Sequence, residues 1–268
     1  MPETEGRTLD NYLSITSKQK SGELTDDAFL GGALQILQPK KGYRAGIDAV
    51  FLAASVPAAQ GHTVLELGSG VGVASLCIAR RVPGVNVMGL EIQPDLVAIA
   101  RENIARNHLQ ESVAIVEGDL AVLPDDLAQR SYDHVVLNPP YYEKDKAVGT
   151  PNNSKLLSKM GTGLPLEDWI GLALKRVKPN GRLTVIHLAD QLGRLLASLD
   201  SKAGKAKIFP LWPKQKSSAS RVIVTATKGS AAPSCLSPGM VLHEDGGDFT
   251  LEANAVLREG QACPIICE

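Results

Sequence analysis

Short apolar runs alternate along most of the chain with segments whose apolar residues recur at helical spacing. Such runs, bounded by turn residues, predict buried strands, and the segments between them predict amphipathic helices. Strands that alternate with helices form a mostly parallel, doubly wound α/β sheet. The last two strands follow each other directly, which predicts an antiparallel hairpin that closes the sheet. The predicted strands are 34–38, 63–67, 85–91, 113–116, 132–137, 183–188, 206–211 and 221–226. The predicted helices are 49–54, 73–81, 94–104, 166–177 and 191–199.

Polarity divides the chain into three parts. Residues 1–26 are polar and turn-rich, which predicts a flexible leader. Residues 27–228 carry the alternating pattern and are expected to form the main domain. Residues 229–268 turn through two prolines and are expected to pack back on that domain as a C-terminal extension. The 268 residues are 44% hydrophobic and 21% charged, which is typical of a soluble globular protein.

Composition excludes several classes of protein. No apolar run approaches the roughly 18 residues of a membrane helix. The acidic N-terminus lacks the basic-then-apolar order of a signal peptide. The 4 cysteines show no paired C-x-x-C spacing, so we expect reduced cytoplasmic thiols and no metal site. A net charge of −1 excludes a uniformly basic nucleic-acid binder but leaves room for a local basic face.

A glycine-rich loop follows the strand 63–67 and precedes a helix. In this arrangement glycines let the backbone approach a nucleotide at the helix N-terminus. A dinucleotide fingerprint would place its third glycine where Val73 stands, and the pattern is instead Glu66-x-Gly68-x-Gly70-x-Gly72. A carboxylate at Glu66 would repel a pyrophosphate and favour a cationic amino group. The loop therefore indicates S-adenosylmethionine (SAM) rather than NAD.

Two further polar positions follow the next strands. Glu91 ends the strand 85–91, 21 positions after Gly70, which is the offset of a ribose-binding carboxylate. Asp119 follows the strand 113–116; it could accept from an adenine amino group while the Leu120 N–H donates to the ring, or it could simply form a turn. All these positions lie at the C-terminal ends of strands, where open parallel sheets bind ligands, so we expect a single pocket.

Asn138-Pro139-Pro140-Tyr141 follows the buried run 132–137. Two successive prolines stiffen the turn and fix the direction of its carbonyls. The Asn138 side-chain oxygen and the Pro139 carbonyl could both accept hydrogens from one planar NH2 group, while Tyr141 offers a ring for stacking. Pulling those hydrogens out of plane would free the nitrogen lone pair. The motif predicts a site that alkylates an amide or an aromatic amine.

The segment before the helix 49–54 has two interpretations. Asp48 suits a helix N-cap, in which case the segment is a plain connection. Alternatively, Tyr43 and Arg44 lie over a ligand pocket. Spacing alone favours the first interpretation.

Charge is unevenly distributed in the second half of the chain. Residues 201–228 carry seven lysines and arginines and no acidic residue, which in a net acidic protein favours contact with a polyanion rather than an idle solvated face. The loop 142–163 adds further lysines. The candidate nucleic-acid-binding residues are Lys144, Lys146, Lys155, Lys214, Lys216 and Arg221.

These motifs together resemble the class I SAM-dependent methyltransferases of the Asn-Pro-Pro-Tyr group. Within that group the chain is similar to the bacterial tRNA1(Val) adenine-N6 methyltransferase family, from about Phe29 to Gly260. The residues that carry the narrower resemblance are Gln38 to Arg44, Asp48 to Ala53, Pro210-Leu211-Trp212-Pro213 and Leu242-His243-Glu244.

The resemblance implies a Rossmann-like, seven-stranded sheet, SAM as cofactor, and methylation of an adenine N6 in tRNA next to the anticodon. Catalysis would rest on Asn138, Pro139 and Tyr141. Protein glutamine N5-methylation and a non-catalytic SAM- or RNA-binding module stay open as alternatives, as does a monomer or a homodimer. The implied cofactor-binding residues are Tyr43, Arg44, Glu66, Gly68, Ser69, Gly70, Glu91, Ile92, Asp119, Leu120 and Asn138.

Overall fold

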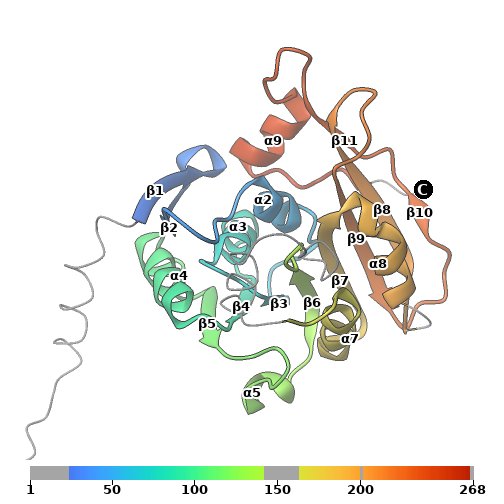
Figure 1. The fold of residues 1–268 in the computed structure, drawn as a ribbon. Helices are drawn as coiled ribbons and strands as arrows, with labels where there is room; N and C mark the ends of the chain where they lie inside the picture. Colours follow the sequence, from blue (N-terminus) through green and yellow to red (C-terminus); the bar gives the residue numbers. More distant parts are fainter. Residues whose placement is uncertain (1–23, 142–162, 200–201, 266–268) are drawn as a thin grey trace, which may run out of the picture.

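A nine-stranded mixed sheet forms the centre of the computed structural model, which describes residues 24–141, 163–199 and 202–265 (Figure 1). The strand order is β10-β8-β9-β7-β6-β3-β4-β5, and β11 also pairs with β8. The central strands are parallel, whereas β9 runs antiparallel to both β7 and β8. The strands are β3 (Thr63–Leu67), β4 (Asn86–Glu91), β5 (Val113–Glu117), β6 (Tyr132–Leu137), β7 (Val177–Leu188), β8 (Ala203–Lys214), β9 (Arg221–Lys228), β10 (Cys235–Leu236) and β11 (Met240–His243).

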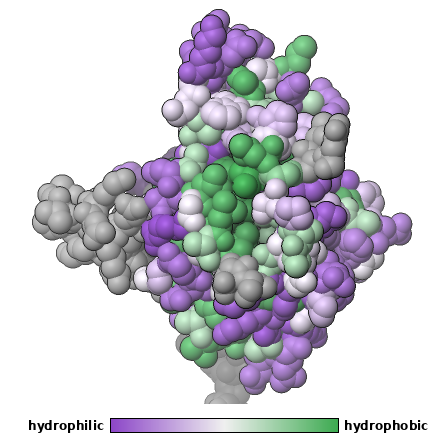
Figure 2. All heavy atoms as spheres, turned by 90° about the vertical axis from the view of Figure 1, so that its right-hand side faces the viewer, coloured by the Kyte–Doolittle hydropathy of each residue, from purple (hydrophilic) through white to green (hydrophobic). Residues whose placement is uncertain are grey.

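The predicted doubly wound sheet and its closing hairpin are confirmed, and the sheet is larger than the seven strands expected. The additional strands are β10 and β11, which both pair parallel to β8. They cover the edge that β8 would otherwise leave open to strand pairing with another chain. On this side of the molecule Figure 2 shows an apolar area bordered by hydrophilic residues, and Leu236 on β10 is 70% exposed.

Helices cover both faces of the sheet because successive strand residues point to opposite sides. On β6, Val136 packs in one core cluster with residues of α2 (Ile47–Ala54), α3 (Val73–Arg81) and α4 (Pro94–Arg106). Its neighbours Val135 and Leu137 pack in the other cluster, with α5 (Asp125–Ala128), α7 (Leu166–Arg176) and α8 (Leu192–Leu199). Two apolar layers thus hold β3 and β6 in the middle of the molecule.

An antiparallel hairpin precedes the domain. It consists of β1 (Leu24–Phe29) and β2 (Leu34–Pro39), joined by the 3-10 turn η1 (Leu30–Gly32). The predicted leader reached residue 26, but β1 begins at Leu24, so the last part of that segment is a strand. The rest of the predicted leader lies outside the described residues.

The C-terminal segment contacts α2 through α9 (Leu251–Glu259) and the residues after it. Ala253, Val256 and Cys263 belong to the core cluster that contains α2, and the Cys263 N–H donates to the Ala54 carbonyl at 2.9 Å. A further 3-10 turn, η3 (Ala189–Gln191), precedes α8.

The expectation that all cysteines are reduced thiols is wrong for one of them. Cys77 and Cys263 are free and buried, but Cys235 is disulfide-bonded. Among the described residues no helix has the length and apolarity needed to cross a membrane. No group of three or more potential metal ligands gathers within the described part of the chain.

Candidate functional site

A cavity lies at the carboxyl edge of the parallel strands. The register places the ends of β4, β3 and β6 side by side, since Leu67 pairs with both Leu90 and Leu137. The loops that leave these strands therefore meet at the topological switch point between β3 and β6, which is where ligands bind in such sheets. The lining residues are Tyr43, Gly68, Gly70, Leu90, Glu91, Ile92, Gln93, Leu96, Gly118, Leu120, Asn138, Pro140 and Trp169.

The glycine loop forms the floor of this cavity. Gly68 and Gly70 have φ values of +72° and +56°, a region that glycine adopts without a side-chain clash. A Cβ on Gly70 would lie 2.4 Å from Cε1 of Tyr43, and one on Gly68 would lie 3.1 Å from the Trp169 ring. Both glycines are thus required by close approach as well as by backbone conformation.

Glu91 is held so that its carboxylate borders the cavity. Its Oε2 accepts from the Gly70 N–H at 2.8 Å and its Oε1 from the Gln93 N–H at 2.9 Å, and the residue is only 5% exposed. Oε1 also accepts from the Gln93 side-chain amide at 3.5 Å. A carboxylate oxygen can accept more than one hydrogen bond, so Oε2 keeps a lone pair that suits a ribose hydroxyl.

Glu66 does not line the cavity. Its Oε2 accepts from both the backbone N–H and the hydroxyl of Ser75, at 2.9 and 2.5 Å. Ser75 stands in the first turn of α3, where backbone N–H groups have no partner within the helix. Burial raises the pKa of Glu66 to about 7, against the opposing effect of the Ser75 hydrogen bonds. The structure therefore places Glu66 under the loop as a helix-capping group rather than beside the expected amino group.

Asn138 and Tyr141 form a polar corner at the other end of the cavity. The Tyr141 hydroxyl lies 2.8 Å from Oδ1 of Asn138 and 2.8 Å from Oδ2 of Asp48. The Arg221 guanidinium donates to the same Asp48 oxygen at 2.9 Å and stands 4.9 Å above the Tyr141 ring. His187 contacts that ring edge-on, at a centroid distance of 5.0 Å.

Two sequence-based interpretations change at this corner. Asp48 was expected to cap α2, but the N-cap is Gly46. Asp48 is the second residue of the helix, and its carboxylate is directed to Tyr141 and Arg221. Arg221 was expected on a nucleic-acid-binding face. Its ion pair with Asp48 makes it part of the corner, with its side chain 27% exposed, and its contact with nucleic acid stays a prediction.

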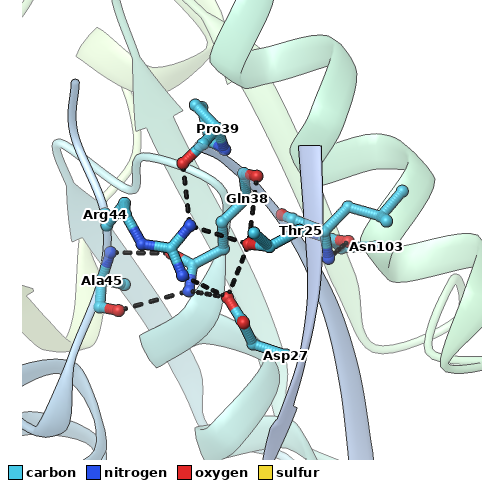
Figure 3. Close-up of polar contacts among 8 residues, drawn as sticks. Thr25, Asp27, Gln38, Pro39, Arg44, Ala45 and Asn103 are labelled. Carbon is cyan, nitrogen blue, oxygen red and sulfur yellow. Dashed lines mark hydrogen bonds and ion pairs between the residues drawn. The ribbon is translucent and has the colours of Figure 1, made fainter. Parts of the chain in front are cut away.

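Arg44 is not among the cavity residues. Its guanidinium forms an ion pair with Asp27 at 2.6 Å and donates to the Thr25 hydroxyl and the Pro39 carbonyl (Figure 3). The side chain thus ties the segment after β2 to the hairpin. Tyr43, its neighbour, does line the cavity as expected.

Other predicted residues divide between the cavity and its surroundings. Ile92 and Leu120 line it, whereas Ser69 and Asp119 do not. The Ser69 hydroxyl is buried without a hydrogen-bond partner, and Asp119 accepts from the Ala121 N–H in a turn. At the proline corner it is Pro140, not Pro139, that borders the cavity. Lys144, Lys146 and Lys155 lie outside the described residues, and Lys214 and Lys216 are exposed.

The residues present fit SAM. Leu90, Leu96 and Leu120 supply apolar surface for an adenine ring, and Glu91 offers an acceptor for a ribose hydroxyl. Nε1 of Trp169 is buried without a hydrogen-bond partner. A buried donor without a partner is costly. The lining thus suits a nucleoside.

The sequence analysis did not identify Trp169, Gln93 and His187 as site residues, and it gave Asp48 a different role. Trp169 occupies the apolar face of a helix, where a tryptophan cannot be distinguished from an ordinary core residue. His187 lies near the end of a strand that pairs with Arg221's strand, and only the register reveals this proximity.

Comparison with known proteins agrees with this geometry. Residues 44–161 match the family model of the methyltransferase small domain. The chain is thus similar to methyltransferases in sequence, as predicted. A tRNA1(Val) (adenine(37)-N6)-methyltransferase of Porphyromonas gingivalis is 30% identical over 56% of this chain and 60% of its own. The protein of the same name from Aeromonas hydrophila is 25% identical over 77% of this chain and 85% of its own. The chain spans about 60% of the length of the Porphyromonas gingivalis relatives.

Solved structures show the same fold. A predicted O-methyltransferase of Agrobacterium tumefaciens superposes with a TM-score of 0.66 at 24% identity, covering 80% of this chain and 97% of that one. A SAM-dependent O-methyltransferase of Thermotoga maritima gives 0.52 at 16% identity, over 72% and 69% of the two chains. The fold is that of the class I methyltransferases.

Proposed function

We propose that this protein is a SAM-dependent methyltransferase that acts on an exocyclic amine, N6 of an adenine next to the anticodon of a tRNA. One observation carries the proposal: Asn138 and Pro140 border the same cavity as Gly68, Gly70 and Glu91. The group that would orient an amine therefore adjoins the groups that would hold the cofactor. The names of the relatives support the choice of adenine and tRNA.

When bound, SAM supplies an electrophilic methyl group on a sulfonium. The glycine loop and Glu91 would hold its nucleoside, and Asn138 with the Pro139 carbonyl would accept the two hydrogens of the target NH2. This positioning turns the nitrogen lone pair toward the methyl, and positioning of two reactants is itself a large catalytic effect. The stiffness of the proline pair keeps the acceptors in place.

No strong base is required by this chemistry, because the N-methylated aminium is acidic enough to lose its proton to water. Burial lowers the pKa of His187 to about 4, so its imidazole is neutral at pH 7.

An adenine must leave its stack to reach the corner, at a cost of a few kcal/mol. The exposed lysines would bind the tRNA phosphates, and a cytoplasmic location follows from a tRNA substrate.

Methyl transfer from labelled SAM tests the proposal. The substrates are a tRNA transcript with an unmodified adenine beside the anticodon, the same transcript with that adenine replaced by guanine, and a glutamine-bearing release-factor peptide. Label on the first alone is the expected result. Label on the peptide alone would overturn the tRNA assignment, and equal label on both transcripts would overturn the choice of base.

Asn138→Ala separates binding from chemistry. We expect this variant to bind SAM within a few-fold of the wild type and to lose about 10²–10³ in turnover, the usual effect of removing one group that acts on the transition state. Calorimetric titration with SAM and single-turnover rates measure the two quantities. Unchanged turnover would show that the amine is not held at Asn138.

A further inference from the structure

We infer that Asp48, fixed by Arg221, orients the Asn138 amide through the Tyr141 hydroxyl and thereby presents the amide oxygen to the target amine. Asp48 would be a positioning residue, since it is not among the residues that line the cavity. The inference rests on the proposed function. It adds that Asp48 on α2 and Arg221 on β9, both far from the Asn138–Tyr141 motif in the sequence, set the orientation of the Asn138 amide.

The Tyr141 hydroxyl has one hydrogen and two oxygens within reach. Oδ2 of Asp48 and Oδ1 of Asn138 each lie 2.8 Å away. Burial and the nearby Asp48 raise the pKa of Tyr141, so the phenol keeps its proton. A single proton can serve only one of the two acceptors in a linear hydrogen bond.

Asp48 is the stronger competitor for that proton. Hydrogen bonds to an ionised acceptor are about twice as strong as neutral ones. Arg221 donates to the same Asp48 oxygen at 2.9 Å, and the two side chains are only 20% and 27% exposed. The ion pair with Arg221 thus holds the carboxylate in place. We expect the Tyr141 proton to reside on the hydrogen bond to Asp48.

The consequence falls on the amide of Asn138. With its proton directed at Asp48, the Tyr141 oxygen becomes an acceptor, and two acceptor oxygens at 2.8 Å repel each other. A half-turn of the amide exchanges its oxygen and nitrogen at nearly the same positions. Nδ2 then donates to Tyr141, and Oδ1 turns away from it, toward the cavity that Asn138 borders.

This orientation is the one that the chemistry needs. An amide oxygen in the cavity accepts a hydrogen from the target NH2, whereas an amide NH2 there would repel it. If Tyr141 donated to Asn138 instead, the amide would present its nitrogen to the substrate. The charge of Asp48 therefore selects the productive orientation of the amide.

Asp48→Asn and Tyr141→Phe test the coupling in the chain as it stands. Each variant removes one link of the relay without removing bulk. We expect turnover to fall about tenfold in each, which is the loss of a single ~1.4 kcal/mol preference, with the Kd for SAM unchanged. The double variant should lose no more than the larger single loss, because residues that act as one unit are not additive. Additive losses, or full turnover in Asp48→Asn, would overturn the inference.

Asp133→Asn is the matched control. At the opposite edge of the sheet, Asp133 likewise accepts from a hydroxyl, that of Thr63 at 2.7 Å, and from a cation, Lys178 at 2.9 Å. Its replacement should lower stability and leave turnover of the folded enzyme intact. A purely structural role of Asp48 would make the two variants behave alike.

A measurement without substrate keeps the inference independent of the proposed function. In protein labelled with 15N at asparagine, the Asn138 NH2 protons should exchange slowly in the wild type and several-fold faster in Tyr141→Phe. Equal exchange in the two proteins would contradict the relay even if the enzyme is active. Absence of methyl transfer in the wild type, with slow exchange retained, would contradict only the proposed function.

Discussion

Individual residues in this site have environments that the residue type alone does not determine. Glu66 is 4% exposed, and burial raises its pKa to about 7, compared with an ordinary value of 4.5. A carboxyl with a raised pKa adds stability below the unfolded pKa, and that stability is lost as the pH rises through the folded one. Between pH 4.5 and pH 8, the unfolding free energy of the wild type should fall by up to roughly 3 kcal/mol relative to that of Glu66→Gln, at ~1.4 kcal/mol per pKa unit.

Urea unfolding of both proteins at several pH values measures this difference. The comparison cancels the other titrating groups, which both proteins share. Parallel stability curves would show that Glu66 titrates normally and that Ser75 fully compensates its burial.

Gly70 combines a positive φ with close contact to Tyr43, and the two effects can be separated. Gly70→Ala should weaken SAM binding at least tenfold. The new methyl group would lie only 2.4 Å from Cε1 of Tyr43, so the Tyr43 ring would have to move. Gly61→Ala is the control, since Gly61 has a φ of +80° and open space at its Cβ position. It should cost only the backbone strain of about 1 kcal/mol and leave the Kd unchanged. A similar loss of SAM affinity in both variants would assign the effect to strain alone.

At this scale the sequence predicts residues whose chemistry follows from backbone position. Gly68, Gly70 and Glu91 follow from the strand-loop-helix pattern alone. It does not predict Asp48 or Arg44, because their roles depend on partners 93 and 17 residues away. Spacing along the chain carries no information about such partners.

Elements show the same division between local and distant information. The helix α4 and its C-cap present two asparagines one turn apart to the edge of β2. Asn103 pairs with the N–H and the carbonyl of Leu37 at 2.8 and 3.1 Å, and Asn107 pairs with both groups of Gln35 at 2.9 Å. Their amides thus act as a substitute for a neighbouring strand and fix the hairpin to the domain.

Asn103→Ala tests this attachment. Asn103 is fully buried and also donates to the Val71 carbonyl beside the glycine loop. Its loss leaves three backbone groups without partners, so we expect a destabilisation of about 2–4 kcal/mol and faster amide exchange at Leu37. Asn254→Ala on the less buried helix α9 is the control and should cost under about 1 kcal/mol. Unchanged protection at Leu37 would contradict the attachment.

Long, strongly periodic elements were predictable, whereas short edge elements were not. The strands β3 to β9 and the helices α3, α4, α7 and α8 follow from apolar runs at the expected periods. β10 has two residues and β11 four, too few for any period to show. β1 escaped prediction because its sequence, Leu-Thr-Asp-Asp-Ala-Phe, is half polar, and its pairing with β2 decides its conformation.

Across the whole molecule, the sheet divides the basic run of residues 201–228 between two opposite edges. Arg221 pairs with Leu188 at the end of β7, so the turn between β8 and β9 lies at the same edge as the cavity. Lys228 pairs with Ala203 and donates to the Val177 carbonyl at the start of β7, which marks the far edge. A continuous basic segment in the sequence is therefore not a continuous surface in the fold.

On the proposed function, this division predicts which lysines would contact tRNA. Lys214 and Lys216 stand at the cavity edge, and Lys202 and Lys205 are equally exposed at the far edge of the same strands. Each phosphate contact contributes about 0.7–0.9 to the slope of log K against log salt. The Lys214→Ala, Lys216→Ala double variant should therefore lower that slope by about 1.5 for tRNA binding. The Lys202→Ala, Lys205→Ala variant removes the same charge and should leave the slope unchanged. Equal effects would mean that net charge rather than location governs binding, and a larger effect at the far edge would place the tRNA away from the Asn138 corner.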